Sequence, residues 1–274
     1  MSLSKLNGIK KIGLIAGNGK FPLLFAREAS RHGLEVVAIA IKKDTSWLIT
    51  PLVKKVYWLT LKDYSRMFDI FKKEEIGKVI MAGQVNPRSL FHKDIGDQTL
   101  KNLLEAIADK RPDTVFTAVA DMLSKHHIEL VDSTLFLDRF LPEKGVLTKT
   151  KPDEKTKQDI HFGFAMAKHV AGLDIGQTLV VKNGAIVAVE AIEGTDAAIR
   201  RGGLLANGGI VVIKVSKPNQ DMRFDIPVVG PRTIRNLSKV KGRCLAIEAG
   251  KTLMIDRDIC VRLADRNRIS IVAV

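Results

Sequence analysis

The sequence predicts an α/β protein with a Rossmann-like N-terminal domain built on a parallel sheet and a distinct C-terminal α/β domain. In the N-terminal half, short apolar runs alternate with helical patterns, which is typical of parallel sheets covered by helices. The stretch LPEKGVLTKTKPDEKTKQ at 141–158 is rich in charge, proline and threonine, as linkers are. We therefore expect domains at 1–141 and 159–274, joined by a linker at 142–158; a surface loop inside one domain is the alternative.

Apolar periodicity places the elements of the N-terminal half. Strands are expected at Lys11–Ala16, Leu34–Ile41, Lys55–Thr60, Lys78–Ala82 and His127–Val131. Helices are expected at Phe21–Arg31, Asp63–Lys73, Gln98–Ala108, Asp113–Lys125 and Ser133–Phe140.

The C-terminal half mixes hairpin and helical signals. Asn183-Gly184 is a strong two-residue hairpin signal between two apolar strands, and Thr195 and Asp256 can each cap a following helix. Strands are expected at Thr178–Lys182, Ala185–Glu190, Gly209–Ser216, Cys244–Glu248, Thr252–Ile255 and Ile269–Val274. Helices are expected at Lys155–Ala171, Thr195–Ala206, Pro231–Val240 and Asp256–Arg266.

The composition excludes several protein classes. With 46% hydrophobic residues, the chain has enough apolar surface to fold, so disorder is not expected. The net charge of +14 favours an anionic partner, although lysines scattered for solubility would give the same total. Cys244 and Cys260 lie in apolar runs without metal-ligand spacing, which indicates buried thiols and a cytoplasmic protein. No apolar run is long enough to span a membrane.

Acids and bases gather between Glu190 and Gly230. Carboxylates bind hard cations such as Mg²⁺, and lysine and arginine bind phosphate oxygens, so together they suit metal-assisted phosphate chemistry. The expected metal ligands are Glu190, Glu193, Asp196, Asp221 and Asp225.

Two turns follow expected strands of the N-terminal sheet. Gly17-Asn18-Gly19 lies between the first strand and helix, where backbone N–H groups can meet an anion. Gly83-Gln84 follows a later strand, where Gln84 and Asn86 can contact a base or sugar. Ligand-free turns are the alternative for both.

Further binding residues are expected in the C-terminal half. Gly194-Thr195 opens a helix and can bind phosphate, or Thr195 is simply a cap. In the loop KPNQDMRFDIP, an extended chain would point Asp221, Arg223 and Asp225 to the same side; a structural Arg–Asp network is the alternative. The turn Asp174–Gln177 is better explained by Asp174 bonding to the backbone.

Other chemistries lack their motifs. The sequence contains no HExxH or HxxEH zinc pattern, no Gly-x-Ser-x-Gly elbow and no Walker loop. A dinucleotide oxidoreductase is disfavoured, because Pro22 stands where the fingerprint needs glycine and no acid ends the second strand.

The segments DIGQ, VVKNGAIVAVEAIEGTD and KVSKPNQDMRFDIPVVGP, together with IGLIAGNGKFP and AGQV, resemble the I-type UDP-2,3-diacylglucosamine pyrophosphatases of bacterial lipid A synthesis. The resemblance covers the whole chain. It implies two domains with the lipid nucleotide between them. It also implies Mg²⁺-dependent hydrolysis of UDP-2,3-diacylglucosamine to UMP and 2,3-diacylglucosamine 1-phosphate (lipid X), a homodimer, and Asp225 as the catalytic aspartate of the QDxRxD motif.

The motifs and loops described above supply the expected substrate-binding residues. They are Gly17, Asn18, Gly19, Gly83, Gln84, Gln177, Gly194, Thr195, Lys217, Gln220 and Arg223. Val228 departs from the threonine that this family often has there. A positive surface would favour transient contact with the anionic inner membrane. A non-catalytic protein that binds a nucleotide sugar or lipid nucleotide is the alternative function, but a pure binder of a diphosphate has little use for so many carboxylates.

Overall fold

The chain folds as two compact units. A computed structural model describes residues 9–84, 96–109 and 111–274. The first unit comprises residues up to Leu137 together with Met222–Asp225, and the second comprises Asp138–Asp221 and Ile226–Val274. A short segment from late in the sequence therefore belongs to the N-terminal unit.

The first unit is built on a five-stranded parallel sheet in the order β3-β2-β1-β4-β5. Its strands are β1 (Lys11–Ala16), β2 (Glu35–Ile41), β3 (Lys55–Leu59), β4 (Lys78–Ala82) and β5 (Glu129–Leu130). The order reverses between β1 and β4, where open α/β sheets bind ligands at the carboxyl ends of their strands. The predicted fold class is confirmed.

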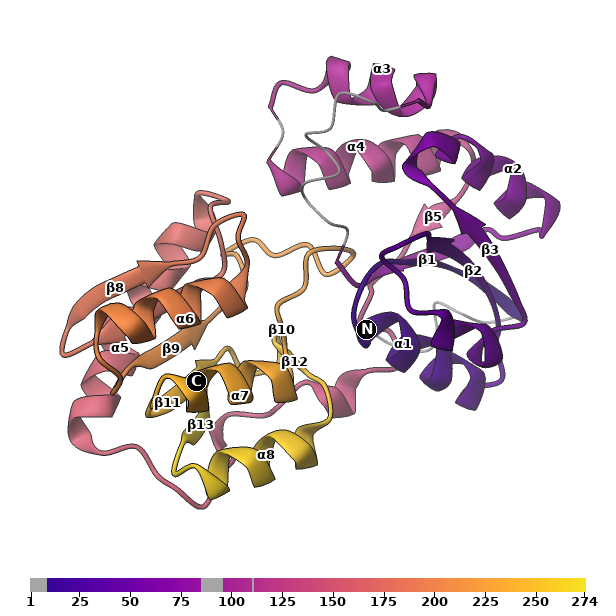
Figure 1. Ribbon diagram of the computed structural model, residues 1–274. Helices are drawn as coiled ribbons and strands as arrows, with labels where there is room; N and C mark the ends of the chain where they lie inside the picture. The colour runs from indigo at the N-terminus through magenta and orange to yellow at the C-terminus, as the bar shows by residue number, and fades with distance from the viewer. Residues whose placement is uncertain (1–8, 85–95, 110) are drawn as a thin grey trace. The chain divides into compact units, whose positions relative to one another are not determined.

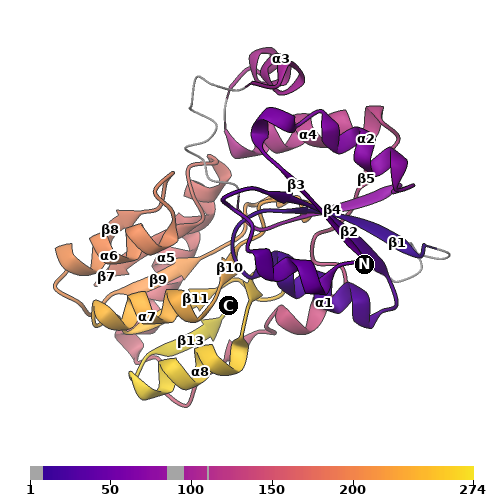
Figure 2. The same ribbon diagram turned by 45° about the vertical axis from the view of Figure 1, so that its right-hand side comes forward.

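Helices cover both faces of this sheet (Figures 1 and 2). Helix α1 (Phe21–Arg31) lies on one face, and α2 (Arg66–Lys73) and α4 (Pro112–Lys125) lie on the other; α3 (Gln98–Ala106) packs outside α4. Strand residues such as Ile39 and Val79 share a core with Phe71 of α2 and Leu123 of α4.

The second unit is built on a six-stranded mixed sheet in the order β6-β13-β11-β9-β7-β8. Its strands are β6 (Gly145–Val146), β7 (Thr178–Lys182), β8 (Ala185–Val189), β9 (Val211–Lys214), β11 (Cys244–Ile247) and β13 (Ser270–Ala273). The hairpin β7–β8 is antiparallel, as the Asn183-Gly184 turn predicts, and β7 also runs antiparallel to β9. A separate parallel pair joins β10 (Val228–Val229) and β12 (Leu253–Met254).

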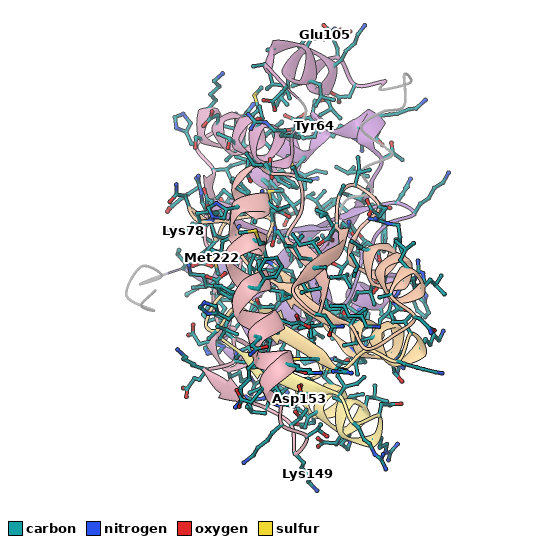
Figure 3. All side chains as sticks on the ribbon, turned by 90° about the vertical axis from the view of Figure 1, so that its left-hand side faces the viewer. Tyr64, Lys78, Glu105, Lys149, Asp153 and Met222 are labelled. Carbon is teal, nitrogen blue, oxygen red and sulfur yellow. The ribbon has the colours of Figure 1, made fainter. Side chains whose placement is uncertain are left out.

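Four helices cover this second sheet. Helix α5 (Glu154–Gly172) packs on one face, while α6 (Thr195–Leu205), α7 (Pro231–Lys239) and α8 (Arg257–Arg266) pack on the other. Asp153 at the start of α5, labelled in Figure 3, caps this helix by accepting a hydrogen bond from the Thr156 backbone N–H at 2.8 Å. Both cysteines are buried in these cores, as predicted.

Some predicted elements differ from those observed. Residues 61–73 form a 3₁₀ turn, η3 (Leu61–Asp63), and then the shorter α2, since Asp63 accepts hydrogen bonds from Thr60 and closes the turn. The predicted helix at 133–140 is reduced to turns and η5 (Asp138–Phe140). Part of the predicted linker at 142–158 forms β6 and the first turn of α5.

The segment Met222–Asp225 is held in the first unit by its backbone and by one aromatic side chain. Ser133 donates two hydrogen bonds to it, from its N–H to the Met222 carbonyl at 2.9 Å and from its hydroxyl to the Arg223 carbonyl at 2.6 Å. Phe224 is buried and stacks on Phe116 of α4, with 5.4 Å between the ring centroids. These contacts fix the position of the neighbouring Asp225.

Among the described residues, no helix is long and apolar enough to cross a membrane.

Replacement of the buried aromatic anchor tests this attachment. Phe224→Ala should destabilise the first unit by about 3–5 kcal/mol, the usual cost of emptying a buried phenylalanine site. Urea unfolding followed by circular dichroism measures this loss. Phe224→Leu, which keeps most of the apolar volume, should lose clearly less, and equal stability of Phe224→Ala and the parent protein would refute the packing role.

Candidate functional site

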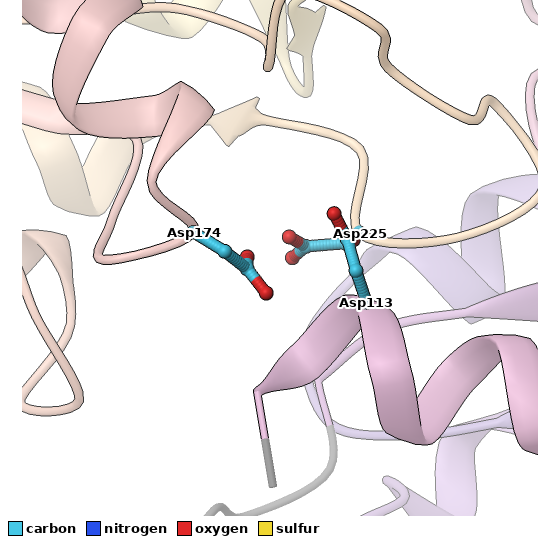
Figure 4. Close-up of side chains that lie close together, drawn as sticks. All are labelled: Asp113, Asp174 and Asp225. Carbon is cyan, nitrogen blue, oxygen red and sulfur yellow. The ribbon is translucent and has the colours of Figure 1, made fainter. Parts of the chain in front are cut away.

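Two carboxylates of the first unit lie close together. Oxygen atoms of Asp113 and Asp225 lie within 4.8 Å of each other, and both side chains are only partly buried. Figure 4 draws both side chains, with Asp113 on the first turn of α4 and Asp225 on the loop that returns to the second unit. The view also draws Asp174, which belongs to the second unit.

The spacing along α4 explains this pairing. Asp113 precedes Phe116 by three residues, so both side chains lie on one face of the helix. Phe116 stacks on Phe224, and Asp225 follows directly. Asp225 has a left-handed backbone with φ of 52°, which aspartate tolerates better than most residues and which marks functional sites when the surrounding structure enforces it. The sequence did not point to Asp113. Its spacing of three residues from Phe116 is informative only once Phe116 is seen to stack on Phe224.

The predicted alternation of Asp221, Arg223 and Asp225 is wrong. Residues 222–224 form a turn rather than an extended strand, so period-two spacing does not apply. Burial of Phe224 drives the turn, because this side chain must point into the core of the first unit. The turn also divides the motif: Gln220 and Asp221 belong to the second unit, and Arg223 and Asp225 to the first.

The two glycine turns of the first unit meet at the sheet's switch point. Asn18 and Gln84 form a bridge, in which Asn18 N–H donates to the Gln84 carbonyl at 2.7 Å and Gln84 N–H donates to the Asn18 carbonyl at 3.1 Å. Glycine is required here: a Cβ on Gly83 would lie 2.5 Å from the Asn18 oxygen, and one on Gly17 would lie 2.7 Å from the Gln84 oxygen. Two turns that the sequence offers separately thus form one surface.

This pairing changes what the turns offer to a ligand. The N–H groups of Gly17, Asn18 and Gln84 are used by other backbone atoms, so they are not directed at an anion. Asn18, Gly19 and Gln84 are exposed, which leaves two side-chain amides at the edge of the sheet. Pro22 packs against Gly83, where a Cβ would meet its ring at 2.9 Å. Asn86 lies outside the described residues.

A polar network lies at one edge of the second sheet. Thr178 begins β7, Glu190 follows β8 and Lys214 ends β9, and the antiparallel register brings these three ends together. Lys214, only 6% exposed, donates to the Thr195 hydroxyl at 2.6 Å, and this hydroxyl donates to Glu190 Oε1 at 2.7 Å. Lys214 Nζ also lies 3.6 Å from Glu190 Oε2.

The environment of Glu190 keeps it ionised. Burial alone raises the pKa of Glu190, but the charge of Lys214 and hydrogen bonds from Thr178 and Thr195 outweigh burial, and its pKa lies below the ordinary value. The Thr195 hydroxyl is thus committed to this network. The N-cap of α6 is Gly194, which has φ of 83°, and not Thr195 as predicted.

Three of the acids expected to bind metal have basic partners instead. Glu190 pairs with Lys214, Glu193 contacts Arg201 at 2.7 Å, and Asp196 contacts Arg232 at 2.6 Å. None of the three belongs to a cluster of potential metal ligands among residues 9–84, 96–109 and 111–274, whereas Asp225 does. Each carboxylate has a basic partner in this structure, and its role as a metal ligand stays a prediction.

The remaining predicted binding residues lie around the start of the loop after β9. Lys217 is buried and forms an ion pair with Asp174 at 2.5 Å between Nζ and Oδ1. Gln220 accepts from the Lys217 N–H at 3.1 Å and donates to the Asp221 carbonyl, which fixes the loop. Asp174, which was expected to bond to the backbone of its own turn, therefore also pairs with the side chain of Lys217. Gln177, also buried, immediately precedes β7.

The Glu190 network predicts a specific response to acid. Because the folded pKa of Glu190 is below its unfolded value of 4.5, the unfolded chain binds more protons as pH falls. Its stabilising effect is therefore complete above pH 4.5 and is lost as pH falls through the folded pKa. Glu190→Gln should melt at a lower temperature at pH 7, with a smaller further decrease between pH 5 and 3 than the parent protein shows.

Thermal melts across this range measure the effect, and adding Mg²⁺ at pH 7 gives a second result. Any Mg²⁺-dependent increase in melting temperature should be the same in Glu190→Gln as in the parent protein. Loss of that increase in the variant would show that Glu190 binds the metal after all.

Comparison with known proteins identifies both halves of the chain. Residues 11–140 match the family model described as LpxI N-terminal domain, and residues 143–272 match the LpxI C-terminal domain. A curated relative from Caulobacter vibrioides, named UDP-2,3-diacylglucosamine pyrophosphatase LpxI, is 29% identical over 270 residues, which cover 94% of this chain and 95% of the relative.

Solved structures resemble the chain only weakly. A Bordetella bronchiseptica WbmG structure with NAD and UDP is 15% identical over 43% of this chain and 34% of that one, with a TM-score of 0.28. A Rhizobium etli pyruvate carboxylase structure is 12% identical over 63% of this chain and 15% of that one, with a TM-score of 0.30. These two structures are too dissimilar to indicate a function for this chain. The two family models together span nearly the whole chain, which therefore belongs to the LpxI family.

Proposed function

We propose that this protein hydrolyses the diphosphate of UDP-2,3-diacylglucosamine to UMP and 2,3-diacylglucosamine 1-phosphate, a step of lipid A synthesis. Membership of the LpxI family and the name of the Caulobacter relative support this substrate. In the reaction, the oxygen of a water molecule bonds to one phosphorus and the bond from that phosphorus to the bridging oxygen breaks. The bridging oxygen stays on the other phosphorus, and the protons of the water pass to the products and to solvent.

The observation that carries the proposal is the Asp113–Asp225 pair. Two carboxylates with oxygens within 4.8 Å, on a surface that water reaches, form a donor set of hard oxygens. Such donors suit Mg²⁺, which binds through one or two carboxylates and completes its coordination with water and phosphate oxygens. A bound Mg²⁺ would supply charge neutralisation at the phosphoryl oxygens.

The chain's own residues then have distinct roles. The Asp225 carboxylate accepts a hydrogen bond from the attacking water and orients it. Asp113 and Asp225 together hold the cation site, and the burial of Phe224 fixes Asp225 within the precision that catalysis needs. Asp225 is thus the catalytic residue of the proposal.

Arg223 lies in the turn that carries Phe224, and its guanidinium group can contact phosphoryl oxygens. Lys217, in the second unit, is buried in an ion pair with Asp174. Gln220, held against the Lys217 backbone, has a fixed orientation. In the first unit, the exposed amides of Asn18 and Gln84 have the donors and acceptors that a uracil or ribose edge requires.

The location and partners are part of the same proposal. The substrate carries two acyl chains, so the enzyme meets it at the cytoplasmic face of the inner membrane, and the net charge of +14 attracts the protein to anionic lipid. We also propose the homodimer that the family resemblance implies.

The competing function is a lipid-nucleotide binding protein without turnover. Two facing carboxylates disfavour it, because they would repel a diphosphate unless a cation lay between them. Turnover separates the two functions directly, since a binder would retain the diphosphate intact.

Metal dependence is the first prediction. UMP release from UDP-2,3-diacylglucosamine should stop in excess EDTA and return when Mg²⁺ is added, because the metal neutralises charge on the phosphoryl oxygens. Chromatography of the nucleotide product measures it. Full turnover in excess EDTA would contradict the metal role, and no turnover under any condition would favour the binding protein.

The second prediction concerns the two aspartates. Asp225→Asn should lower kcat and kcat/KM together by about 10²–10⁴-fold while the variant stays folded. Asp113→Asn should mainly raise the Mg²⁺ concentration needed for half-maximal rate, by about tenfold or more. Asp121→Asn is the matched control, since Asp121 is exposed on the same helix outside the pair. Near-normal kcat in folded Asp225→Asn would remove Asp225 from the reaction.

The third prediction concerns the paired turns. Asn18→Ala and Gln84→Ala should each raise KM severalfold with little change in kcat, because their side chains contact the nucleotide and not the reacting phosphorus. Initial rates at varied substrate concentration measure this, and UMP inhibition should weaken in parallel. Unchanged KM in both variants would exclude this edge from substrate binding.

A further inference from the structure

One surface turn of the first unit exposes large apolar side chains that its fold does not explain. Trp47 is 73% exposed and Leu48 is 52% exposed, and they are the exposed large hydrophobic residues found in the described part of this unit. The two are adjacent and begin the 3₁₀ helix η2 (Trp47–Leu52), which follows β2. Two such residues side by side form a patch rather than the isolated exposure that is normal on protein surfaces.

The residues on either side hold this turn in place. The Thr45 hydroxyl donates to the Ala16 carbonyl at 2.5 Å and accepts from the Ile41 N–H at 2.9 Å, which ties the turn to the ends of β1 and β2. Ile49 is completely buried. Trp47 and Leu48 are therefore presented between two fixed points, and a partner would pay little conformational entropy to bind them.

Basic residues accompany the apolar pair. Lys42 and Lys43 lie at the end of β2, both exposed, and Lys43 has a left-handed backbone with φ of 74°, which marks a tight turn. Tryptophan with lysines a few residues away in the sequence favours the interface of an anionic bilayer, where the indole lies among the headgroups and the ammonium groups meet phosphate.

We propose that Trp47 and Leu48, flanked by Lys42 and Lys43, form a docking site for the surface of an anionic lipid bilayer. The inference deepens the proposed function and rests on it in one respect, namely that a diacyl substrate must be reached in a membrane. Binding of the turn to a membrane does not depend on catalysis. The net charge of the protein attracts it to anionic lipid but does not specify which surface binds, whereas this turn does.

Another exposed apolar pair provides a comparison within the chain. Leu204 and Leu205 at the end of α6 are 78% and 71% exposed. The sequence contains no tryptophan or tyrosine between Thr195 and Lys214, and Arg201 is held by Glu193 at 2.7 Å, which offsets its charge. The Trp47 turn is therefore better suited to membrane binding than the Leu204–Leu205 pair.

Vesicle binding by the full-length protein tests the proposal. Sedimentation with vesicles of phosphatidylglycerol and phosphatidylethanolamine should show binding that weakens about tenfold or more in the double variant Trp47→Ser, Leu48→Ser. Reversal of both flanking lysines, Lys42→Glu and Lys43→Glu, should cost about fivefold per lysine or more. Binding to neutral phosphatidylcholine vesicles should be weak for all forms.

Matched controls separate the turn from general effects. Leu204→Ser with Leu205→Ser removes an equally exposed apolar pair, and Lys72→Glu with Lys73→Glu reverses two exposed lysines on α2. Both control variants should bind vesicles much better than their counterparts at the turn. Equal losses in control and test variants would overturn the proposal.

Tryptophan fluorescence gives a direct readout, because the chain contains two tryptophans and Trp58→Phe leaves Trp47 alone. Its emission should shift to the blue with anionic vesicles. No shift with vesicles, together with quenching by UMP, would overturn the proposal and place Trp47 at the nucleotide instead. UMP release from substrate dispersed in detergent should stay normal in Trp47→Ser, Leu48→Ser, so failure of the proposed hydrolysis would be visible independently of vesicle binding.

Discussion

The burial of Phe224 in the first unit is the constraint on which the site depends. A segment encoded among residues of the second unit is folded into the first because one aromatic ring fills a place beside Phe116. The backbone hydrogen bonds from Ser133 then fix the turn, and Asp225 is carried to within reach of Asp113. Two carboxylates alone would repel each other. The apolar contact between Phe224 and Phe116 therefore provides the energy that holds Asp225 near Asp113.

Charge pairing explains how three neighbouring acids of the second unit are held. Glu190, Glu193 and Asp196 lie close together in sequence, yet each is offset by its own base and serves to join β8, α6 and α7. A paired carboxylate is poorly suited to binding a cation, because the competing positive charge lies in the same place. Asp113 and Asp225 have carboxylate oxygens within 4.8 Å of each other, and a divalent cation can bind to such a pair.

In the first unit, backbone hydrogen bonds determine which groups remain available to a ligand. At a switch point of the order 3-2-1-4-5, glycine turns commonly present N–H groups to a phosphate. Here the turns after β1 and β4 bond to one another and Pro22 fills the space beside Gly83, so these N–H groups are not directed at a phosphate. The same α/β scaffold is thereby directed away from dinucleotide binding without any change in topology.

The sequence by itself determined the fold class, most strand and helix positions, the hairpin at Asn183-Gly184 and the identity of Asp225 as a residue to examine. These follow from local periodicity, turn chemistry and motif, which act over a few residues. Only the tertiary structure decided that the loop turns at Met222–Phe224, that Asp113 is the partner of Asp225, and that Glu190, Glu193 and Asp196 are neutralised. Such outcomes depend on contacts between residues up to about a hundred positions apart, and nothing in a local pattern specifies which distant side chain fills a core or offsets a charge.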